Sequence, residues 1–324
     1  MIKALAVTEA SGKLQPFEYH EEVGETDVLV RVTHCGICHS DVHLIDGDWG
    51  DVYPLVPGHE IVGVVERVGS GVHSTQVGER VGIGWQCNSC GVCEQCSDHN
   101  EVFCKQNQPT CMGHFGGFAD SVIADERFII SLPDTLDSAS AAPLLCGGAT
   151  VFTPIDQYTK PGDSVAVVGI GGLGHLAIQI AKAKGCTVTA ISQSSDKEAL
   201  ARELGADDFV SAPAVGAYDL ILNTAHVNMP MNEYLAALKP NGTFVQLGIA
   251  PDPMIIDDIT KLVDGNKRIA GSAIAHPNKI KELLNLAAEH TIGATVQVMN
   301  MSEANAGVEI TRSNQARFRV VLEN

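Results

Sequence analysis

Short runs in which apolar and polar residues alternate mark the first part of the chain. Residues 27–32 (DVLVRV) and 60–69 (EIVGVVERVG) follow this pattern, and Gly and Pro interrupt the runs. A period of two residues is typical of β-strands with one face buried. Residues 1–145 are therefore predicted to form an irregular β domain.

Residues from about 149 onward follow a different pattern, in which apolar runs alternate with helical segments. Because strands and helices alternate at this spacing, we predict a parallel, doubly wound α/β sheet. Its strands are expected at residues 164–169, 187–192, 218–225 and 242–250, and its first helices at 172–185 and 196–206.

An amphipathic helix at 278–290 and an apolar strand at 318–324 follow the alternating region. We expect this tail to rejoin the first domain, so that the α/β domain is inserted between two pieces of the β domain. The predicted domains are then residues 1–145 with 275–324, and residues 146–274.

The composition is that of a globular protein and narrows the choice of partners. The chain has 324 residues, which suggests two domains, and 45% of them are hydrophobic, which is enough to fill two cores. Lys and Arg number 21 against 39 Asp and Glu, and the net charge of −18 repels phosphate backbones and acidic membranes. We therefore expect neither a nucleic acid nor a membrane as partner.

The opening residues, MIKALAVTEASGKL, lack a basic stretch followed by a long apolar one, and no apolar run reaches the ~18 residues of a bilayer span. A cytoplasmic location is therefore expected. In a reducing compartment, clustered cysteines favour metal binding or catalysis over disulfides. The ten cysteines of the chain are thus candidates for these roles.

Five of the cysteines lie in one segment, CNSCGVCEQCSDHNEVFC, which runs from Cys87 to Cys104. Three successive CxxC gaps followed by a longer one are typical of a zinc site, because CxxC turns bring two sulfurs onto one ion. Five cysteines compete for four positions, and we select Cys90, Cys93, Cys96 and Cys104. An all-thiolate set leaves no open position, so this zinc is predicted to be structural. A zinc ribbon that binds nucleic acid is the alternative, and the acidic charge counts against it.

A second set mixes cysteine with histidine. Cys38 lies in GICHSDVH, His59 in PGHEIVG and Cys146 in LLCGG. Two thiolates and one imidazole leave a fourth position for water or substrate, which is the arrangement of a catalytic zinc. A lone histidine at a strand start is more often a satisfied polar residue, so this prediction depends on the three motifs together.

A glycine-rich turn opens the α/β region. It comes directly after a predicted strand, leads into a predicted helix, and contains Gly169, Gly171, Gly172, Leu173 and Gly174. Such a turn lets backbone N–H groups and the helix N-terminus approach a pyrophosphate. This context predicts a dinucleotide site, with a purely structural turn as the alternative.

In order and spacing, GICHSDVH, PGHEIVG, the cysteine segment, LLCGG and GIGGLG resemble the motifs of the zinc-dependent medium-chain alcohol dehydrogenases. The resemblance covers essentially the whole chain and is closest to the cinnamyl-alcohol-dehydrogenase-like branch, which includes bacterial aldehyde reductases. It implies a GroES-like catalytic domain, a Rossmann dinucleotide-binding domain, one catalytic and one structural zinc per chain, and a homo-oligomer, either dimer or tetramer. Cys87 has no counterpart in the cysteine ladder of that family.

The same resemblance implies roles for the residues of the open metal site. Cys38, His59 and Cys146 match the protein ligands of the catalytic zinc. Glu60 matches a carboxylate that can take the open position when substrate is absent. Asp41 matches the carboxylate that orients the ligand imidazole, a role that metal sites commonly need.

Further residues match positions around the substrate. Ser40 matches a hydroxyl that contacts the substrate oxygen, although capping of a helix is an alternative explanation for a serine there. His43 matches the outer end of a proton relay through the nicotinamide ribose, and Thr150 a residue near the nicotinamide. Trp49 and Trp85 match walls of the substrate pocket, with core packing as the alternative.

The residues after the second strand of the α/β region bear on the choice of cofactor. NAD enzymes of this fold carry Asp or Glu about 20 residues beyond the glycine turn, where it holds the adenine ribose. Here the strand ends in Ser192, and Ser194 and Lys197 follow. These three match the phosphate-binding positions of the NADP-dependent cinnamyl branch, so NADP(H) is the predicted cofactor. The alternative is a polar loop without this role.

These features predict a zinc-dependent oxidoreductase that interconverts primary alcohols and aldehydes by hydride transfer with NADP(H), favouring aldehyde reduction. Its expected partner is a small alcohol or aldehyde. Two alternatives stay open. One is a non-catalytic nucleotide-binding protein on the same fold, since fold alone does not secure activity. The other is an NAD-dependent polyol dehydrogenase, which usually lacks an intact cysteine ladder.

Overall fold

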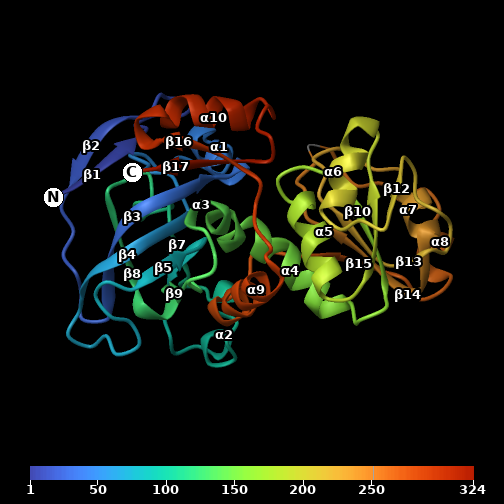
Figure 1. Cartoon of the computed structure of the whole chain (residues 1–324), viewed down its shortest axis with the longest axis horizontal. Helices are drawn as coiled ribbons and strands as arrows, with labels where there is room; N and C mark the ends of the chain where they lie inside the picture. The colour runs from blue at the N-terminus through green and yellow to red at the C-terminus, as the bar shows by residue number, and fades with distance from the viewer. Residues whose placement is uncertain (251) are drawn as a thin grey trace. The chain divides into compact units, whose positions relative to one another are not determined.

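The computed structural model describes residues 1–250 and 252–324, and the chain divides into two compact units (Figure 1). Unit 1 consists of Met1–Cys146 together with Ala275–Asn324. Unit 2 is the intervening segment, Gly147–Ile274. This division assigns Cys146 to unit 1, which also contains the other residues of the mixed cysteine and histidine set, Cys38 and His59.

Unit 1 is built mainly of strands, and its helices are short apart from α9 and α10. Its N-terminal piece contains β1 (Ile2–Ala6), β2 (Gln15–Tyr19), β3 (Asp27–Ile37), α1 (His39–Asp46), β4 (Glu60–Val68), β5 (Arg80–Ile83), β6 (Gln86–Asn88), α2 (Glu94–Ser97), the 3-10 helix η1 (Glu101–Phe103), β7 (Gln108–Pro109), β8 (Ser121–Asp125), η2 (Glu126–Phe128), β9 (Ile130–Ser131), α3 (Ser138–Ala141) and η3 (Ala142–Leu145). Its C-terminal piece contains α9 (Pro277–His290), β16 (Val296–Asn300), η5 (Met301–Glu303), α10 (Ala304–Arg312) and β17 (Arg319–Glu323).

The main sheet of unit 1 joins these two pieces. Its strand order is β16-β17-β3-β4-β5-β9, and β8 pairs with β3 outside this path. β17 runs antiparallel to β3, with Leu322 opposite Cys35. Val28, Val30 and Val32 of β3 are buried, which is the one-faced burial that the alternating pattern predicts. The helix α10 packs on β17 and on α1.

The helix α1 begins directly after β3 and carries several of the predicted site residues. It ends at Gly47, whose φ of 80° is the left-handed conformation that glycine adopts without strain. Arg312 of α10 holds its last residue, Asp46, with Nη2 and Nε at 2.8 and 3.1 Å from the two carboxylate oxygens. The position of α1 is therefore fixed at both ends.

Unit 2 alternates strands and helices along the chain. Its elements are α4 (Gly147–Tyr158), β10 (Ser164–Val168), α5 (Gly174–Ala183), β11 (Thr187–Ile191), the 3-10 helix η4 (Ser195–Lys197), α6 (Glu198–Glu203), β12 (Asp208–Val210), β13 (Tyr218–Asn223), α7 (Met231–Ala237), β14 (Leu238–Gln246), α8 (Thr260–Val263) and β15 (Arg268–Gly271).

The strands of unit 2 form one parallel sheet in the order β12-β11-β10-β13-β14-β15. Figure 1 shows α5 and α6 on one side of this sheet and α7 and α8 on the other. Burial on both faces explains why β10 and β13 read as continuous apolar runs rather than alternating ones. The predicted doubly wound α/β class is confirmed, and β12 and β15 are additional edge strands.

None of the single helices within residues 1–250 and 252–324 is long and apolar enough to cross a membrane. One bent pair of helices, Ser138–Leu145 with Gly147–Tyr158, reaches that length and composition only when its two members are taken together. Most residues of this pair are buried.

Candidate functional site

Cys38, His59, Glu60 and Cys146 lie together in unit 1, with one ligand atom from each within 4.8 Å of the others. Sheet register explains the meeting of the first three, because the start of β4 lies beside the end of β3, with Glu60 opposite Gly36. Cys38 follows β3 as the N-cap of α1, and Cys146 follows η3. The structure thus brings together the set that the three sequence motifs suggested.

The chemistry of this cluster fits a zinc ion. His59 is fully buried, and its Nε2 has no hydrogen-bond partner among residues 1–250 and 252–324. A buried polar atom of this kind is costly unless it binds something. Two thiols beside one imidazole nitrogen are a donor set that suits zinc. A hydrogen bond with Cys146 lowers the pKa of Cys38, which favours the thiolate that a metal requires.

Asp41 is the buried carboxylate that orients the imidazole of His59. Its Oδ1 accepts hydrogen bonds from His59 Nδ1 at 3.0 Å and from the backbone N–H of Gly58 at 2.8 Å. Its Oδ2 accepts from the backbone N–H of Cys38 at 2.8 Å, which also caps α1. Burial lowers the pKa of His59, but the charges of Asp41 and Cys146 and the hydrogen bonds with Asp41 and Cys111 together raise the pKa well above its usual value. The hydrogen bond at Nδ1 leaves the Nε2 lone pair free for a metal.

Glu60 is held by an arginine that sequence reasoning did not identify. Arg319 of β17 is buried, and its Nη2 donates to Glu60 Oε1. The other carboxylate oxygen, Oε2, is buried and has no hydrogen-bond partner in the described part of the chain. Burial raises the pKa of Glu60 to about 7, although the guanidinium of Arg319 acts in the opposite direction. An arginine inside the apolar run FRVVL was the one available signal, since a buried charge needs a partner.

The helix α1 carries two further candidates, Ser40 and His43. Ser40 Oγ lies 3.7 Å from Cys38 Sγ. His43 lies one turn further along α1, and its Nδ1 donates to Asp48 Oδ2 at 2.7 Å. The side chain of His43 is one-third exposed, so it has access to solvent. Asp48 was not identified from the sequence, because nothing in the motif distinguishes it from other acidic loop residues.

The two tryptophans lie beside these groups. The ring of Trp85 stands edge-on to His59, with centroids 4.9 Å apart, and the rings of Trp49 and Trp85 are 6.0 Å apart. Trp49 also stacks on His43 at 5.2 Å. Its exposed fraction of 36% excludes a purely core role. The aromatic side chains therefore form a continuous row from His43 to His59.

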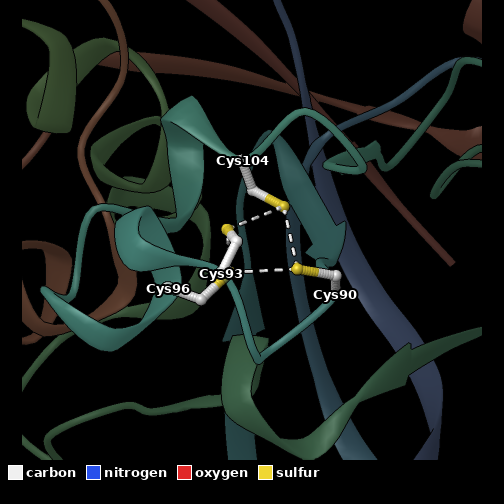
Figure 2. A group of neighbouring side chains, drawn as sticks. All are labelled: Cys90, Cys93, Cys96 and Cys104. Carbon is white, nitrogen blue, oxygen red and sulfur yellow. Dashed lines mark hydrogen bonds between the residues drawn. The ribbon is translucent and has the colours of Figure 1, made fainter.

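The four cysteines of the ladder point toward one another in Figure 2. The sulfur–sulfur distances are 3.5 Å for Cys90 and Cys104, 3.6 Å for Cys93 and Cys96, 3.8 Å for Cys93 and Cys104, and 3.9 Å for Cys90 and Cys96. A tetrahedron with zinc–sulfur bonds of about 2.3 Å has edges of about 3.8 Å. The cluster therefore has the dimensions of a tetrathiolate zinc site.

Cys87 lies outside this cluster. Its side chain is in the core of unit 1, and its Sγ lies 3.5 Å from the carbonyl oxygen of Gln108. Burial raises the pKa of Cys87 to about 12, whereas the backbone N–H groups of Val92 and Cys93 lower that of Cys90 to about 6. Cys87 is thus a core thiol, whereas the thiol of Cys90 ionises readily, as a metal ligand must.

The glycine turn of unit 2 is shaped for close approach of the backbone. Gly169 has a φ of 84°, and a Cβ on Gly174 would overlap the carbonyl oxygen of Gly169. The hydroxyl of Thr224 lies 2.9 Å from the carbonyl oxygens of both Val168 and Gly169 and holds the turn in place. Thr224 was not identified from the sequence, because it approaches the turn from a different strand.

The residues expected at the adenine ribose lie at the same end of the sheet. Lys197 Nζ donates to the carbonyl oxygen of Ile170 at 3.1 Å, which puts its charge at the glycine turn. The backbone N–H of Ser194 donates to Ser192 Oγ at 3.2 Å. Thr150 lies on α4, which packs on α5 within the same unit.

Comparison with known families gives two matches that together span most of the chain. Residues 24–134 match the alcohol dehydrogenase GroES-like domain, and residues 172–289 match the zinc-binding dehydrogenase family. The chain is also 40% identical to the aldehyde reductase AdhA of Synechocystis sp. over 334 aligned residues, which cover 100% of this chain and 99% of that protein.

Two solved structures are also similar to the chain over nearly its whole length. The chain is similar to a cinnamyl alcohol dehydrogenase of Sorghum bicolor, with a TM-score of 0.93, 38% identity, and coverage of 99% of this chain and 97% of that one. It is also similar to the cinnamyl alcohol dehydrogenase of Helicobacter pylori complexed with NADP(H), with a TM-score of 0.91, 29% identity and the same coverage. The combination of a GroES-like domain with a Rossmann-like parallel sheet is therefore confirmed.

Proposed function

Because the chain belongs to the zinc-binding medium-chain alcohol dehydrogenases, in the branch of the cinnamyl alcohol dehydrogenases and aldehyde reductases, we propose that it interconverts primary alcohols and aldehydes with NADP(H). Aldehyde reduction is the proposed favoured direction. The observation that carries the proposal is the cluster of the half-buried Cys38 with the buried His59 and Cys146, in which His59 Nε2 has no partner among the described residues. Three protein ligands with Glu60 alongside are typical of catalytic rather than structural zinc.

Each residue of the cluster has a distinct task in this proposal. Cys38, His59 and Cys146 would hold the metal, and Asp41 keeps the imidazole in the required tautomer. Zinc bound there would polarise the oxygen of the alcohol or aldehyde and bring the pKa of the alcohol toward neutrality. Arg319 holds Glu60 beside the ligands and offsets part of the negative charge of the thiolates.

Proton movement is assigned to side chains of α1. In oxidation, the hydroxyl of Ser40 accepts the proton of the alcohol as its own proton passes on toward solvent, and the transfer runs in reverse in reduction. His43 exchanges protons with solvent, and the Asp48 carboxylate, which accepts a hydrogen bond from its Nδ1, holds the ring in place. The bound nicotinamide would accept or supply the hydride, which is chemistry that belongs to the cofactor.

The proposed substrates are primary alcohols and unbranched or flat aromatic aldehydes. Trp49 and Trp85 stand next to His59 and His43, and two large rings leave little room for branching at the carbinol carbon. We expect higher kcat/KM for primary alcohols than for branched secondary ones, measured with a panel of aliphatic and aromatic substrates. Faster turnover of branched secondary alcohols would contradict this arrangement of the pocket.

NADP(H) is the proposed cofactor, bound through Ser192, Ser194 and Lys197. Two observations support it: Lys197 reaches the glycine turn, and the similar Helicobacter pylori protein is complexed with NADP(H). Unit 2 also presents a hydroxyl, Ser192, where NAD enzymes of this fold carry a carboxylate.

The variant Ser192→Asp is expected to shift the preference toward NADH by about 10-fold or more. The new carboxylate repels a 2′-phosphate a few ångströms away, and a charge pair at such a distance is worth about 1 to 4 kcal/mol. The measurement is the ratio of kcat/KM for NADPH and NADH. Ser195→Asp adds the same charge to the adjoining exposed turn and serves as the control, with a smaller shift expected. A wild-type enzyme that is more efficient with NADH would contradict the proposal.

A further inference from the structure

Arg127, on η2, makes hydrogen bonds in two directions. On one side, its Nε and Nη2 donate to Asp125 at 2.7 and 3.2 Å, and this carboxylate is buried. On the other side, Nη2 donates to Asn88 Oδ1 at 3.0 Å and to the Ser89 carbonyl oxygen at 2.9 Å, while Nη1 lies 3.3 Å from Ser89 Oγ. The guanidinium therefore ties a buried carboxylate to the residues that directly precede Cys90.

Two contacts continue from Arg127 into the cysteine cluster. Ser89 Oγ, which accepts from the guanidinium, lies 3.4 Å from Cys96 Sγ. Gly91 lies between two cysteines of the cluster with a φ of 69°, and a Cβ there would stand 2.5 Å from Arg127 Nη1. The guanidinium thus lies against Gly91, in the turn that carries Cys90 and Cys93, and a side chain at that position would displace it.

The region around the four cysteines is negatively charged, so a cation beside it is stabilising. Four thiolates around one divalent zinc leave a net charge of about −2. The cysteine segment adds Glu94, Asp98 and Glu101 and contains neither lysine nor arginine. A guanidinium supplies a positive charge, as an ammonium group does, and adds a rigid planar set of N–H donors that an ammonium group lacks.

We propose that Arg127 is a positioning residue of the four-cysteine zinc site. It fixes Asn88–Gly91 against Asp125, aims the hydroxyl of Ser89 at Cys96, and offsets the charge of the thiolates. This inference rests on the proposed role of the four cysteines as zinc ligands. Mutation of residues that hydrogen-bond to metal ligands commonly lowers metal affinity by about 10- to 100-fold.

The test measures zinc release rather than activity. His59→Ala protein is used as the background, because its remaining zinc is expected in the four-cysteine site. The rate at which zinc passes to a chromogenic chelator is compared for this background alone and with Arg127→Gln or Arg127→Lys added. We expect release about 10- to 100-fold faster with Arg127→Gln. Arg127→Lys keeps the charge without the fork and is expected to release zinc severalfold faster, which keeps the test valid if the glutamine variant folds poorly.

Arg80→Gln is the matched control. Arg80 is also a partly buried arginine of unit 1, and it donates to the carbonyl oxygens of Pro133 and Leu136, away from the cysteines. Its loss is expected to leave zinc release within about twofold of the background. Equal release rates for the Arg127 and Arg80 variants would overturn the inference. A background protein without any zinc would instead overturn the assignment of the four cysteines.

A double-mutant cycle tests the path through Ser89. Ser89→Ala removes the hydroxyl between Arg127 and Cys96. If both residues act through this path, their combined effect on the release rate is smaller than the product of the two single effects. Independent effects that multiply would exclude Ser89 as the connection.

Discussion

Replacing His59 by alanine is expected to leave a folded protein that has lost at least about 1,000-fold of its turnover. The change removes one of three proposed ligands from the open site, and the Lewis acid there is worth several kcal/mol in the transition state. Folding is retained because the neighbours of His59 belong to the well-packed sheet of β3 and β4. Far-UV circular dichroism and thermal unfolding measure the fold, and kcat measures the loss.

His73→Ala is the control for this prediction. His73 lies in an exposed loop, and its described hydrogen bond to Glu126 comes from the backbone rather than the ring. Its loss is expected to leave kcat within about twofold, because surface substitutions rarely exceed ±0.5 kcal/mol. If His59→Ala kept near-normal turnover, the open site would not have the proposed catalytic role. Equal loss of folding in His59→Ala and Cys93→Ser would contradict the division between a catalytic and a structural site.

Replacing Cys93 by serine is expected to impair folding rather than turnover alone, so that little folded protein is recovered. The loop around this residue has little core of its own, since Val92 and Phe103 are 85% and 62% exposed. Metal binding at structural zinc sites contributes about 10 to 16 kcal/mol in isolated peptides, and whole domains are stable by only about 5 to 15 kcal/mol. Yield of soluble protein and the midpoint of thermal unfolding measure the effect.

Cys87→Ala provides the matched comparison, since Cys87 precedes the cluster by three positions and packs in the core. Loss of a small buried side chain costs about 1 kcal/mol and leaves the four ligands in place. A Cys93→Ser protein as stable as wild type would show that the cluster does not support the fold. Zinc loss in Cys87→Ala would show that the wrong four cysteines were selected.

The sequence predicted those features that are local. Period-two alternation identified β3 and β4, continuous apolar runs identified β10 and β13, and the regular cysteine spacing identified the ladder. Each of these signals lies within one short segment, so it can be read without knowing the fold.

Partners from distant segments could not be predicted in this way. Arg319 reaches Glu60 only because β17 pairs with β3, and Thr224 reaches the glycine turn only because β13 lies beside β10. Arg127 meets the cysteine turn from a separate helix that follows β8. In each case the surrounding sequence does not indicate the contact, because the partner comes from a distant segment that the fold brings close.

The two metal sites carry the central claim, and the zinc content of purified protein tests it most directly. The measurement is the number of zinc ions per chain in preparations of known specific activity with NADPH and an aromatic aldehyde. We predict two zinc ions per chain in fully active protein, with activity falling as the open site loses its metal. Full activity with one zinc or none would contradict the account.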